Sequence, residues 1–303
     1  MNAKLGLMAC ALACSGCVAT MAPLLNTAVA NMSLQDVHQA LDKGQQLMDS
    51  QRDMPVQDEI ALGAGIASNM LGAAPLWQDK KAQHYVNQLG QWLARQTERA
   101  DLAWHFAVLD DAEFNAFAAP GGYVFITRGL LQSMRNEAEL AGVLSHEIAH
   151  VVRKHHVIAI KKAQARGIAT ELGAKGATLL AQNSATVGKY RELTPALAKM
   201  ATAGMEMYVR GLDQGDEFEA DRMGVVIAAR AGYDPYGLPA ALQTLQTLNP
   251  QAAGLALMFR THPTFAARLD MLAQVMGPEF DRFDAQPVLA ARFKSSVAMP
   301  KTK

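Results

Sequence analysis

The chain has 303 residues, enough for one large or two modest domains with a substantial hydrophobic core. Its formal net charge is zero and 18% of its residues are charged, so we expect no nucleic-acid partner. Alanine and glycine are abundant and aromatic residues make up 6%, a composition that favours closely packed helices over a β-sandwich.

The first part of the chain has the pattern of an export signal. An early lysine precedes an apolar run from Leu5 to Leu25, and Ala28-Val29-Ala30 has the small-x-small form of a cleavage site. We therefore expect a signal peptide over residues 1–30 and a mature chain in the periplasm. The alternative is lipoprotein processing at Cys17, within Cys14-Ser-Gly-Cys17, which would attach the protein to the membrane. A retained membrane span is a third interpretation, weakened by a proline and small residues in the run.

Helical spacing of apolar residues marks the beginning of the mature chain. It predicts helices at Ser33–Met48, Val56–Leu71 and Asp79–Thr97, with Pro55 as a start signal for the second. We interpret all three as packing helices. His84 lies on the polar face of the third helix, so we expect its side chain to be exposed.

Two strands are predicted after these helices. Residues Trp104–Leu109 contain alternating β-branched and aromatic side chains, and Pro120-Gly121-Gly122 makes a tight turn into Tyr123–Thr127. An edge strand at this place could hold an extended peptide by main-chain pairing. We therefore expect the substrate strand to consist of Tyr123, Val124, Phe125 and Ile126. An ordinary core hairpin is an equal alternative.

The motif His146-Glu-Ile-Ala-His150 indicates the chemistry of the chain. Helix-forming residues precede it, so we expect one α-helix from Glu137 to His156. Positions four apart share a helix face, so His146 and His150 can bind one ion while Glu147 projects beside it towards a metal-bound water. Two imidazoles and a carboxylate with one open position suit zinc. Chance is the alternative, but apolar neighbours predict burial, and buried histidines without a partner would be costly.

A third metal ligand must come from farther along the chain. The run Asp216-Glu-Phe-Glu-Ala-Asp-Arg222 begins a helix that is predicted to end at Gly232. Glu217 and Asp221 share a face, so one can bind zinc while the other accepts a hydrogen bond from a ligating imidazole. Glu171 is the rival ligand, without a partner carboxylate nearby. The non-functional alternative is an acidic helix N-terminus stabilised by the helix dipole.

The remaining segments are predicted to be helical. His155 and His156 do not fit an extended ligand pattern, and we expect them to be solvated at the helix end. Ala163–Met207, rich in alanine and glycine, is predicted as loosely specified helices that either pack or act as a movable lid. Two further helices are predicted at Leu238–Leu248 and Thr264–Met276.

Four ordered motifs carry a resemblance to a known family. They are Asn115-Ala-Phe-Ala-Ala-Pro-Gly-Gly122, HEIAH, EFEAD, and Thr261-His262-Pro263 followed by Arg268. Together they resemble the HtpX, CAAX-prenyl-protease and Oma type of gluzincin zinc metallopeptidase, in particular the exported bacterial members related to the β-barrel-assembly-enhancing protease. The resemblance spans Val56–Met276. It implies a mainly helical α+β fold, a zincin-like metallopeptidase domain with a small sheet beside the HExxH helix.

The resemblance assigns roles to residues of these motifs. It makes His146, His150 and Glu217 the ligands of one zinc ion. It makes Glu147 the general base and Asp221 the carboxylate behind a ligand.

The last motif and the domain limits complete the expectation. His262 would assist catalysis or occupy the fourth zinc position at rest, with Arg268 beside it. We expect a metallopeptidase domain over residues 31–276 and a C-terminal tail over residues 277–303. Unlike some relatives, the chain is expected to have neither transmembrane helices around the catalytic domain nor a repeat domain for partner binding.

These features predict a zinc endopeptidase of the bacterial cell envelope. It would hydrolyse peptide bonds in unfolded or misassembled envelope proteins, using a zinc-bound water activated by Glu147. The alternative is a latent zinc protein that acts mainly as a periplasmic chaperone or scaffold, with His262 capping the metal. A purely structural zinc domain is disfavoured because the mature part contains no cysteine ligands.

Overall fold

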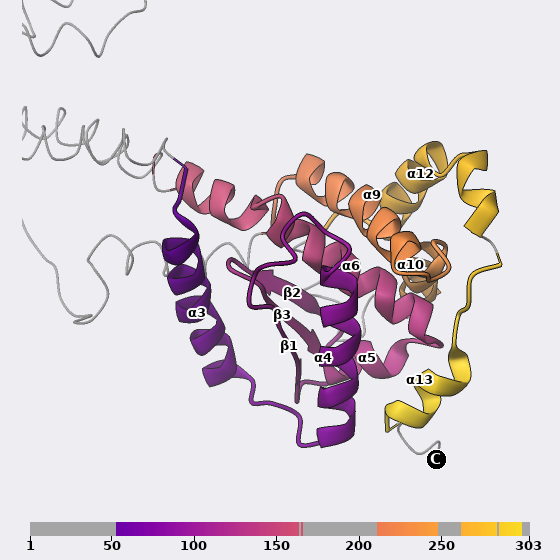
Figure 1. The fold of residues 1–303 in the computed structure, drawn as a ribbon, viewed down its shortest axis with the longest axis horizontal. Helices are drawn as coiled ribbons and strands as arrows, with labels where there is room; N and C mark the ends of the chain where they lie inside the picture. The colour runs from indigo at the N-terminus through magenta and orange to yellow at the C-terminus, as the bar shows by residue number, and fades with distance from the viewer. Residues whose placement is uncertain (1–52, 164, 166–210, 248–261, 284, 299–303) are drawn as a thin grey trace, which may run out of the picture. The chain divides into compact units, whose positions relative to one another are not determined.

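The computed structural model describes residues 53–163, 165, 211–247, 262–283 and 285–298 (Figure 1). Within these ranges the fold is mainly helical with one three-stranded sheet, which confirms the predicted α+β class. In chain order the elements are α3 (Val56–Ala73), α4 (Lys80–Ala94), β1 (His105–Leu109), β2 (Ala116–Ala119), β3 (Tyr123–Thr127), α5 (Arg128–Ser133), α6 (Glu137–Val152), α9 (Gln214–Arg230), α10 (Gly237–Thr247), α12 (Phe265–Val275), the 3-10 helix η3 (Pro278–Phe283) and α13 (Ala290–Ser296). The predicted helix Ser33–Met48 and almost all of Ala163–Met207 lie outside the described residues.

The helix limits follow the local signals in the sequence. Pro55 directly precedes α3, and Asp79 Oδ1 accepts hydrogen bonds of 3.0 Å from two backbone N–H groups in the first turn of α4. Thr264 Oγ1 accepts the N–H of Ala267 at 3.3 Å at the start of α12. Gly232, with φ of +90°, follows α9. The predicted helices in these places are confirmed, and in the described part of the chain no helix is long and apolar enough to cross a membrane.

The sheet has the strand order β1-β3-β2. β1 pairs with β3 in parallel, with His105 opposite Tyr123, and β2 pairs with β3 antiparallel, with Ala116 opposite Ile126. The prediction that Tyr123–Ile126 form an edge strand is therefore wrong. β3 is the central strand, and its main chain is paired on both sides within the sheet, so it has no row of free groups to offer a peptide.

The turn between β2 and β3 is the tight one that the sequence predicts. Gly121 and Gly122 have φ values of +76° and +101°, which side chains rarely tolerate. A Cβ atom on Gly121 would lie 2.6 Å from the Cα atom of Ile60 in α3, so this helix packs directly on the turn. The antiparallel pair β2 and β3 matches the alternative interpretation of this segment as a hairpin in the core.

Helix α6 is the central helix of the fold (Figure 1). It contacts α9 and α10 as well as α4 and β2, and every residue from Glu137 to Val152 is buried. Gly224 lets α9 approach closely, because a Cβ atom there would lie 2.9 Å from the backbone nitrogen of His146. The acidic helix α9 therefore lies directly against the part of α6 that carries the two histidines.

Helix α6 ends earlier than the sequence predicts. We expected one helix as far as His156, but α6 stops at Val152, and a new helical segment begins at His155. Between them Lys154 adopts a left-handed conformation with φ of +57°, which changes the direction of the chain. As a result His155 and His156 are only 2% and 8% exposed, so the prediction that they are solvated is wrong.

The described residues after 276 pack on the same core, contrary to the expectation of a tail. α13 packs against α4 and α6. Phe293 in α13 is fully buried and contacts the Tyr85 ring edge to face, with 6.4 Å between ring centroids. The carbonyl oxygen of Val288 accepts hydrogen bonds from the first two N–H groups of α6 at 3.0 and 3.2 Å. The described part of the C-terminal segment therefore closes the N-terminal end of α6.

Candidate metal centre

His146 and His150 lie one helical turn apart on α6, as their spacing predicts. Their Nε2 atoms are 3.0 Å apart, and the two residues are 3% and 2% exposed. Burial and the charges of the neighbouring histidines lower the pKa of His150 well below its usual range, so this imidazole is neutral. Two buried imidazoles that direct nitrogens to one point suit a shared cation.

Glu217 on α9 faces the same point. Its Oε2 atom lies 3.6 Å from His146 Nε2, and its Oε1 atom lies 3.6 Å from His150 Nε2. Glu217 is 1% exposed, and Oε2 has no hydrogen-bond donor among the described residues. Burial acts to raise the pKa of Glu217, but His262, His146 and Arg268 hold it at about 2, so the group is a carboxylate. An ionised, buried oxygen with no hydrogen-bond partner within 3.5 Å is a group that a bound cation would satisfy.

His262 approaches from the segment before α12. Its Nε2 atom lies 3.7 Å from Glu217 Oε2, and its side chain is 12% exposed. One ligand atom each from His146, Glu217 and His262 lie within 4.8 Å of one another. The structure thus brings together the four ligand candidates of the sequence motifs, whereas the rival Glu171 lies outside the described residues.

The spacing of the ligand atoms fits a zinc ion. Bonds of about 2.0–2.2 Å at tetrahedral angles put neighbouring ligand atoms roughly 3.3 Å apart. The Nε2 atoms of His146 and His150 are 3.0 Å apart, and each lies 3.6 Å from a different carboxylate oxygen of Glu217, so these separations fall on either side of that value. A set of two histidines and one glutamate leaves a fourth position for water or substrate, as in catalytic zinc sites.

Asp221 and Arg268 lie at Nδ1 of His146, the ring nitrogen that does not face Glu217 and His150. Asp221 Oδ1 lies 2.8 Å from His146 Nδ1, and Arg268 donates to both carboxylate oxygens, Nε to Oδ2 at 2.9 Å and Nη2 to Oδ1 at 2.5 Å. Burial acts to raise the pKa of Asp221, but the Arg268 charge and hydrogen bonds hold it well below its usual range. The ionised carboxylate keeps a proton on Nδ1 of His146, which leaves Nε2 directed at the site.

The protonation of His146 links metal binding to proton release. Burial and the Arg268 charge act to lower its pKa, yet Asp221 and Glu217 outweigh them and raise the pKa of His146 to about 9. The imidazole therefore carries a proton on Nε2 at neutral pH, and a metal ion must displace it.

Glu147 lines a small cavity beside the histidines. The cavity has a volume of about 30 Å³, enough for about one water molecule. Its wall combines polar and apolar side chains, among them His146, Glu147, His262, Arg268, Val143 and Leu242. Burial raises the pKa of Glu147 to about 7, where a carboxyl group can both accept and release a proton at neutral pH.

A second set of contacts around His150 was missed by the sequence analysis. His150 Nδ1 lies 3.0 Å from His155 Nδ1, and His155 Nε2 lies 3.4 Å from Glu219 Oε2. Arg153 Nε lies 2.6 Å from Glu219 Oε1. The sequence predicts His155 to be solvated and assigns no role to Glu219. The only signal was a third histidine five positions after His150.

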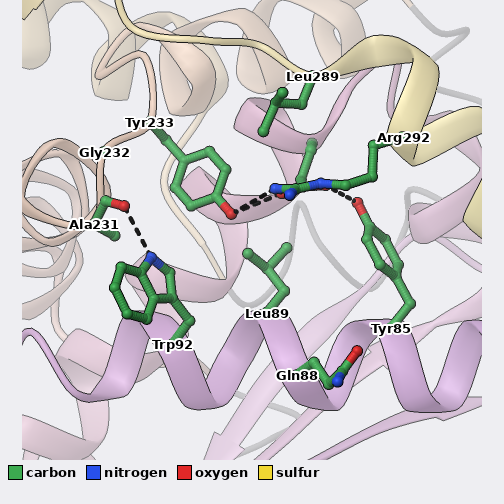
Figure 2. A pocket seen from close by; sticks show the side chains of 10 residues that line it. Tyr85, Gln88, Leu89, Trp92, Ala231, Gly232, Tyr233, Leu289 and Arg292 are labelled. Carbon is green, nitrogen blue, oxygen red and sulfur yellow. Dashed lines mark hydrogen bonds and ion pairs between the residues drawn. The ribbon is translucent and has the colours of Figure 1, made fainter.

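A larger cavity of about 390 Å³ lies away from this site (Figure 2). At its wall the buried Glu137 accepts hydrogen bonds of 2.7 Å from the hydroxyl groups of Tyr85 and Tyr233 and pairs with Arg292. Trp92 donates its indole N–H to the carbonyl oxygen of Ala231 at 2.9 Å. Both oxygens of Glu137 accept hydrogen bonds, so this carboxylate has no unsatisfied atom to offer a metal ion. The smaller cavity beside the two histidines is therefore the better candidate for the reaction site, despite its size.

Comparison with known proteins agrees with this geometry. Residues 80–276 match peptidase family M48. The chain is 32% identical over 216 residues to the proteins named "Beta-barrel assembly-enhancing protease" of Yersinia pestis and Escherichia coli K12, which covers 71% of this chain and 43% of each relative. It is 30% identical over 186 residues to the "Mitochondrial metalloendopeptidase OMA1" of Schizosaccharomyces pombe, which covers 61% of this chain and 50% of that relative. The match thus spans less than half the length of the two bacterial relatives.

Proposed function

The chain belongs to peptidase family M48, and on that premise we propose that it is a zinc metalloendopeptidase of the bacterial cell envelope. Its substrates would be unfolded or misassembled proteins, cleaved at internal peptide bonds. The observation that carries the proposal is the position of Glu217, whose buried Oε2 atom has no hydrogen-bond partner within 3.5 Å among the described residues and lies 3.6 Å from His146 Nε2. His146, His150 and Glu217 would hold the ion.

The side chains of the site support a hydrolytic mechanism. A bound zinc ion supplies a Lewis acid that polarises a peptide carbonyl and favours ionisation of water. Glu147, with its pKa raised to about 7, takes a proton from the attacking water as the water oxygen bonds to the carbonyl carbon. It then passes that proton to the amine nitrogen as the carbon–nitrogen bond breaks.

His262 and Arg268 have different parts in this mechanism. His262 lines the cavity with Glu147 and would donate a hydrogen bond to the carbonyl oxygen as negative charge develops there. Arg268 is engaged with both oxygens of Asp221, so it acts through Asp221 on the orientation of His146.

The proposed place and substrates rest on the relatives and on the N-terminal sequence. Two relatives carry names that refer to β-barrel assembly, which supports substrates in the cell envelope. The predicted signal over residues 1–30 lies outside the described residues and supports a periplasmic location, with lipid attachment at Cys17 as the alternative. Mass spectrometry of the mature N-terminus distinguishes cleavage after Ala30 from a lipidated Cys17.

The test of the enzymatic proposal is the variant Glu147→Gln. It should keep zinc at a ratio near one ion per chain, because Glu147 is not among the proposed ligands, and it should lose cleavage of casein used as an unfolded substrate. Glu98→Gln, at an exposed glutamate, is the matched control and should cleave as the wild type does. Undiminished cleavage by the Glu147 variant would remove the assignment.

A latent protein with a chaperone or scaffold role is the second candidate. It is supported by His262, whose Nε2 atom lies near Glu217 and could occupy the fourth metal position. Suppression of aggregation, compared between wild type and Glu147→Gln, separates the two candidates. A scaffold should be indifferent to this substitution, whereas a protease should lose its effect with its activity.

A further inference from the structure

We propose that His155 is a positioning residue for the metal centre, which holds the imidazole of His150 in the tautomer and orientation that bind the ion. This inference rests on the proposed metal site and deepens it. His155 lies beyond the HExxH motif, after the left-handed turn at Lys154, and is buried against His150.

The orientation of His150 determines where its proton must be. Its Nε2 atom faces His146 Nε2 at 3.0 Å and Glu217 Oε1 at 3.6 Å, so this nitrogen must be free of a proton to bind a metal. The proton then resides on Nδ1. The atom 3.0 Å from Nδ1 is the Nδ1 atom of His155, which must accept the hydrogen bond.

This acceptor role fixes the tautomer of His155 as well. With its Nδ1 accepting, the neutral imidazole carries its proton on Nε2. That atom lies 3.4 Å from Glu219 Oε2 and 4.0 Å from Asp216 Oδ1, so it points towards acidic groups at the start of α9. Arg153 Nε in turn holds the other oxygen of Glu219 at 2.6 Å. The chain of contacts runs from His150 through His155 to Glu219.

The two histidine ligands are thus supported in different ways. His146 is held by a fully buried carboxylate, Asp221, which Arg268 fixes. His150 is held by a buried imidazole, and the carboxylate behind it, Glu219, is 33% exposed. His155 is not a further ligand, because it lies against Nδ1 of His150, on the side of that ring away from the site.

Substitutions at His155 test whether the hydrogen bond or only the volume matters. His155→Leu fills the space but offers no acceptor, whereas His155→Asn keeps an acceptor oxygen at a distance from the backbone similar to that of Nδ1. Loss of a group that orients a ligand typically costs about 10–100-fold in metal affinity. We therefore expect zinc affinity, measured by competition with a chromophoric chelator, to fall about 10–100-fold in the leucine variant and to recover most of the way in the asparagine variant.

Controls separate positioning from a general loss of structure. The same two substitutions at His84, an exposed histidine on α4, should leave zinc affinity unchanged. Urea unfolding in the presence of excess chelator reports whether the metal-free variants fold. If the leucine variant does not fold, Glu219→Met at the partly exposed end of the chain of contacts replaces it, and zinc affinity should again be reduced.

The outcomes distinguish this inference from the proposed function. Wild-type affinity in a folded His155→Leu protein, or in Glu219→Met when that variant stands in for it, overturns the positioning role. Equal losses in the leucine and asparagine variants also overturn it, since volume would then be the cause. If the wild type itself binds no zinc, the proposed function fails, and the positioning role fails with it.

Discussion

Replacing Gly224 with alanine should push α9 away from α6 and weaken the metal centre. A Cβ atom at this position would lie 2.9 Å from the backbone nitrogen of His146 and 3.1 Å from its Cα atom. Ordinary contact begins at 3.4 Å, so the two helices would have to separate by about half an ångström. The atoms in the way belong to a helix backbone, which cannot yield as a flexible side chain can.

The energetic effect follows from this displacement. Overpacking of a core contact costs about 1–3 kcal/mol, while removal of a helical glycine returns up to about 1 kcal/mol. We therefore expect the metal-free protein to lose about 1 kcal/mol of unfolding free energy. Glu217 lies two helical turns before Gly224 and would move with α9. Since metal–ligand distances tolerate only about 0.2 Å, zinc affinity should fall about tenfold or more.

A second glycine on the same helix provides the control. A Cβ atom on Gly215 would meet nothing within 4 Å, so Gly215→Ala should keep zinc affinity and leave stability equal or slightly higher. Urea unfolding in chelator gives the stability, and chelator competition gives the affinity. If Gly224→Ala behaves like Gly215→Ala in both measurements, the close approach of the two helices does not set the ligand geometry.

Two further predictions concern the N-terminal end of α6. Arg292→Met should lower the unfolding free energy at neutral pH by about 1–3 kcal/mol, because Glu137 is 1% exposed and keeps only two tyrosine donors. Burial acts to raise the pKa of Glu137, but its hydrogen bonds with Arg292 and the tyrosines lower it. In the wild type the stabilisation from the ionised Glu137 is therefore fully present above the usual glutamate pKa and is lost as the pH falls through the lowered pKa. The free energy of unfolding, measured in urea at a series of pH values, should fall less on acidification in the Arg292→Met variant than in the wild type. Phe293→Ala should lower the free energy of unfolding in urea by about 3–5 kcal/mol, because Phe293 is fully buried. The control Val288→Ala, at a residue that is 41% exposed, should lower it by less than about 0.5 kcal/mol. Similar losses in the two variants would contradict the packing of α13 in the core.

The local geometry of the metal motif could be predicted because helical spacing alone sets it. His146 and His150 are four apart on one helix, so their approach needs no knowledge of the rest of the fold. The pair Glu217 and Asp221 could be predicted for the same reason on its own helix. That the two helices meet was not visible in the spacing; the order of the motifs, through the family resemblance, supplied it.

The features that sequence reasoning missed depend on single backbone torsions or on distant contacts. The burial of His155 follows from the left-handed conformation of Lys154, a residue type that gives no signal for this conformation. The central position of β3 follows from the parallel pairing of β1, and alternation within a strand does not indicate its neighbours. The docking of α13 depends on Arg292, which meets Glu137 across 155 positions of sequence.

The metal centre is best understood as an interface between two helices. α6 supplies both imidazoles and the proposed base, while α9 supplies the carboxylate ligand, and acceptors on α9 lie behind both imidazoles, directly at Asp221 and through His155 at Glu219. In the run EFEAD, Glu217 and Asp221 are four apart and share the helix face towards α6, whereas Glu219 lies on another face and reaches Arg153 and His155 just after α6. A change in the distance between α6 and α9 therefore displaces the proposed ligand Glu217 together with the acceptors Asp221 and Glu219. This is why a Cβ atom at Gly224, which would meet the backbone of His146, should disturb the whole centre.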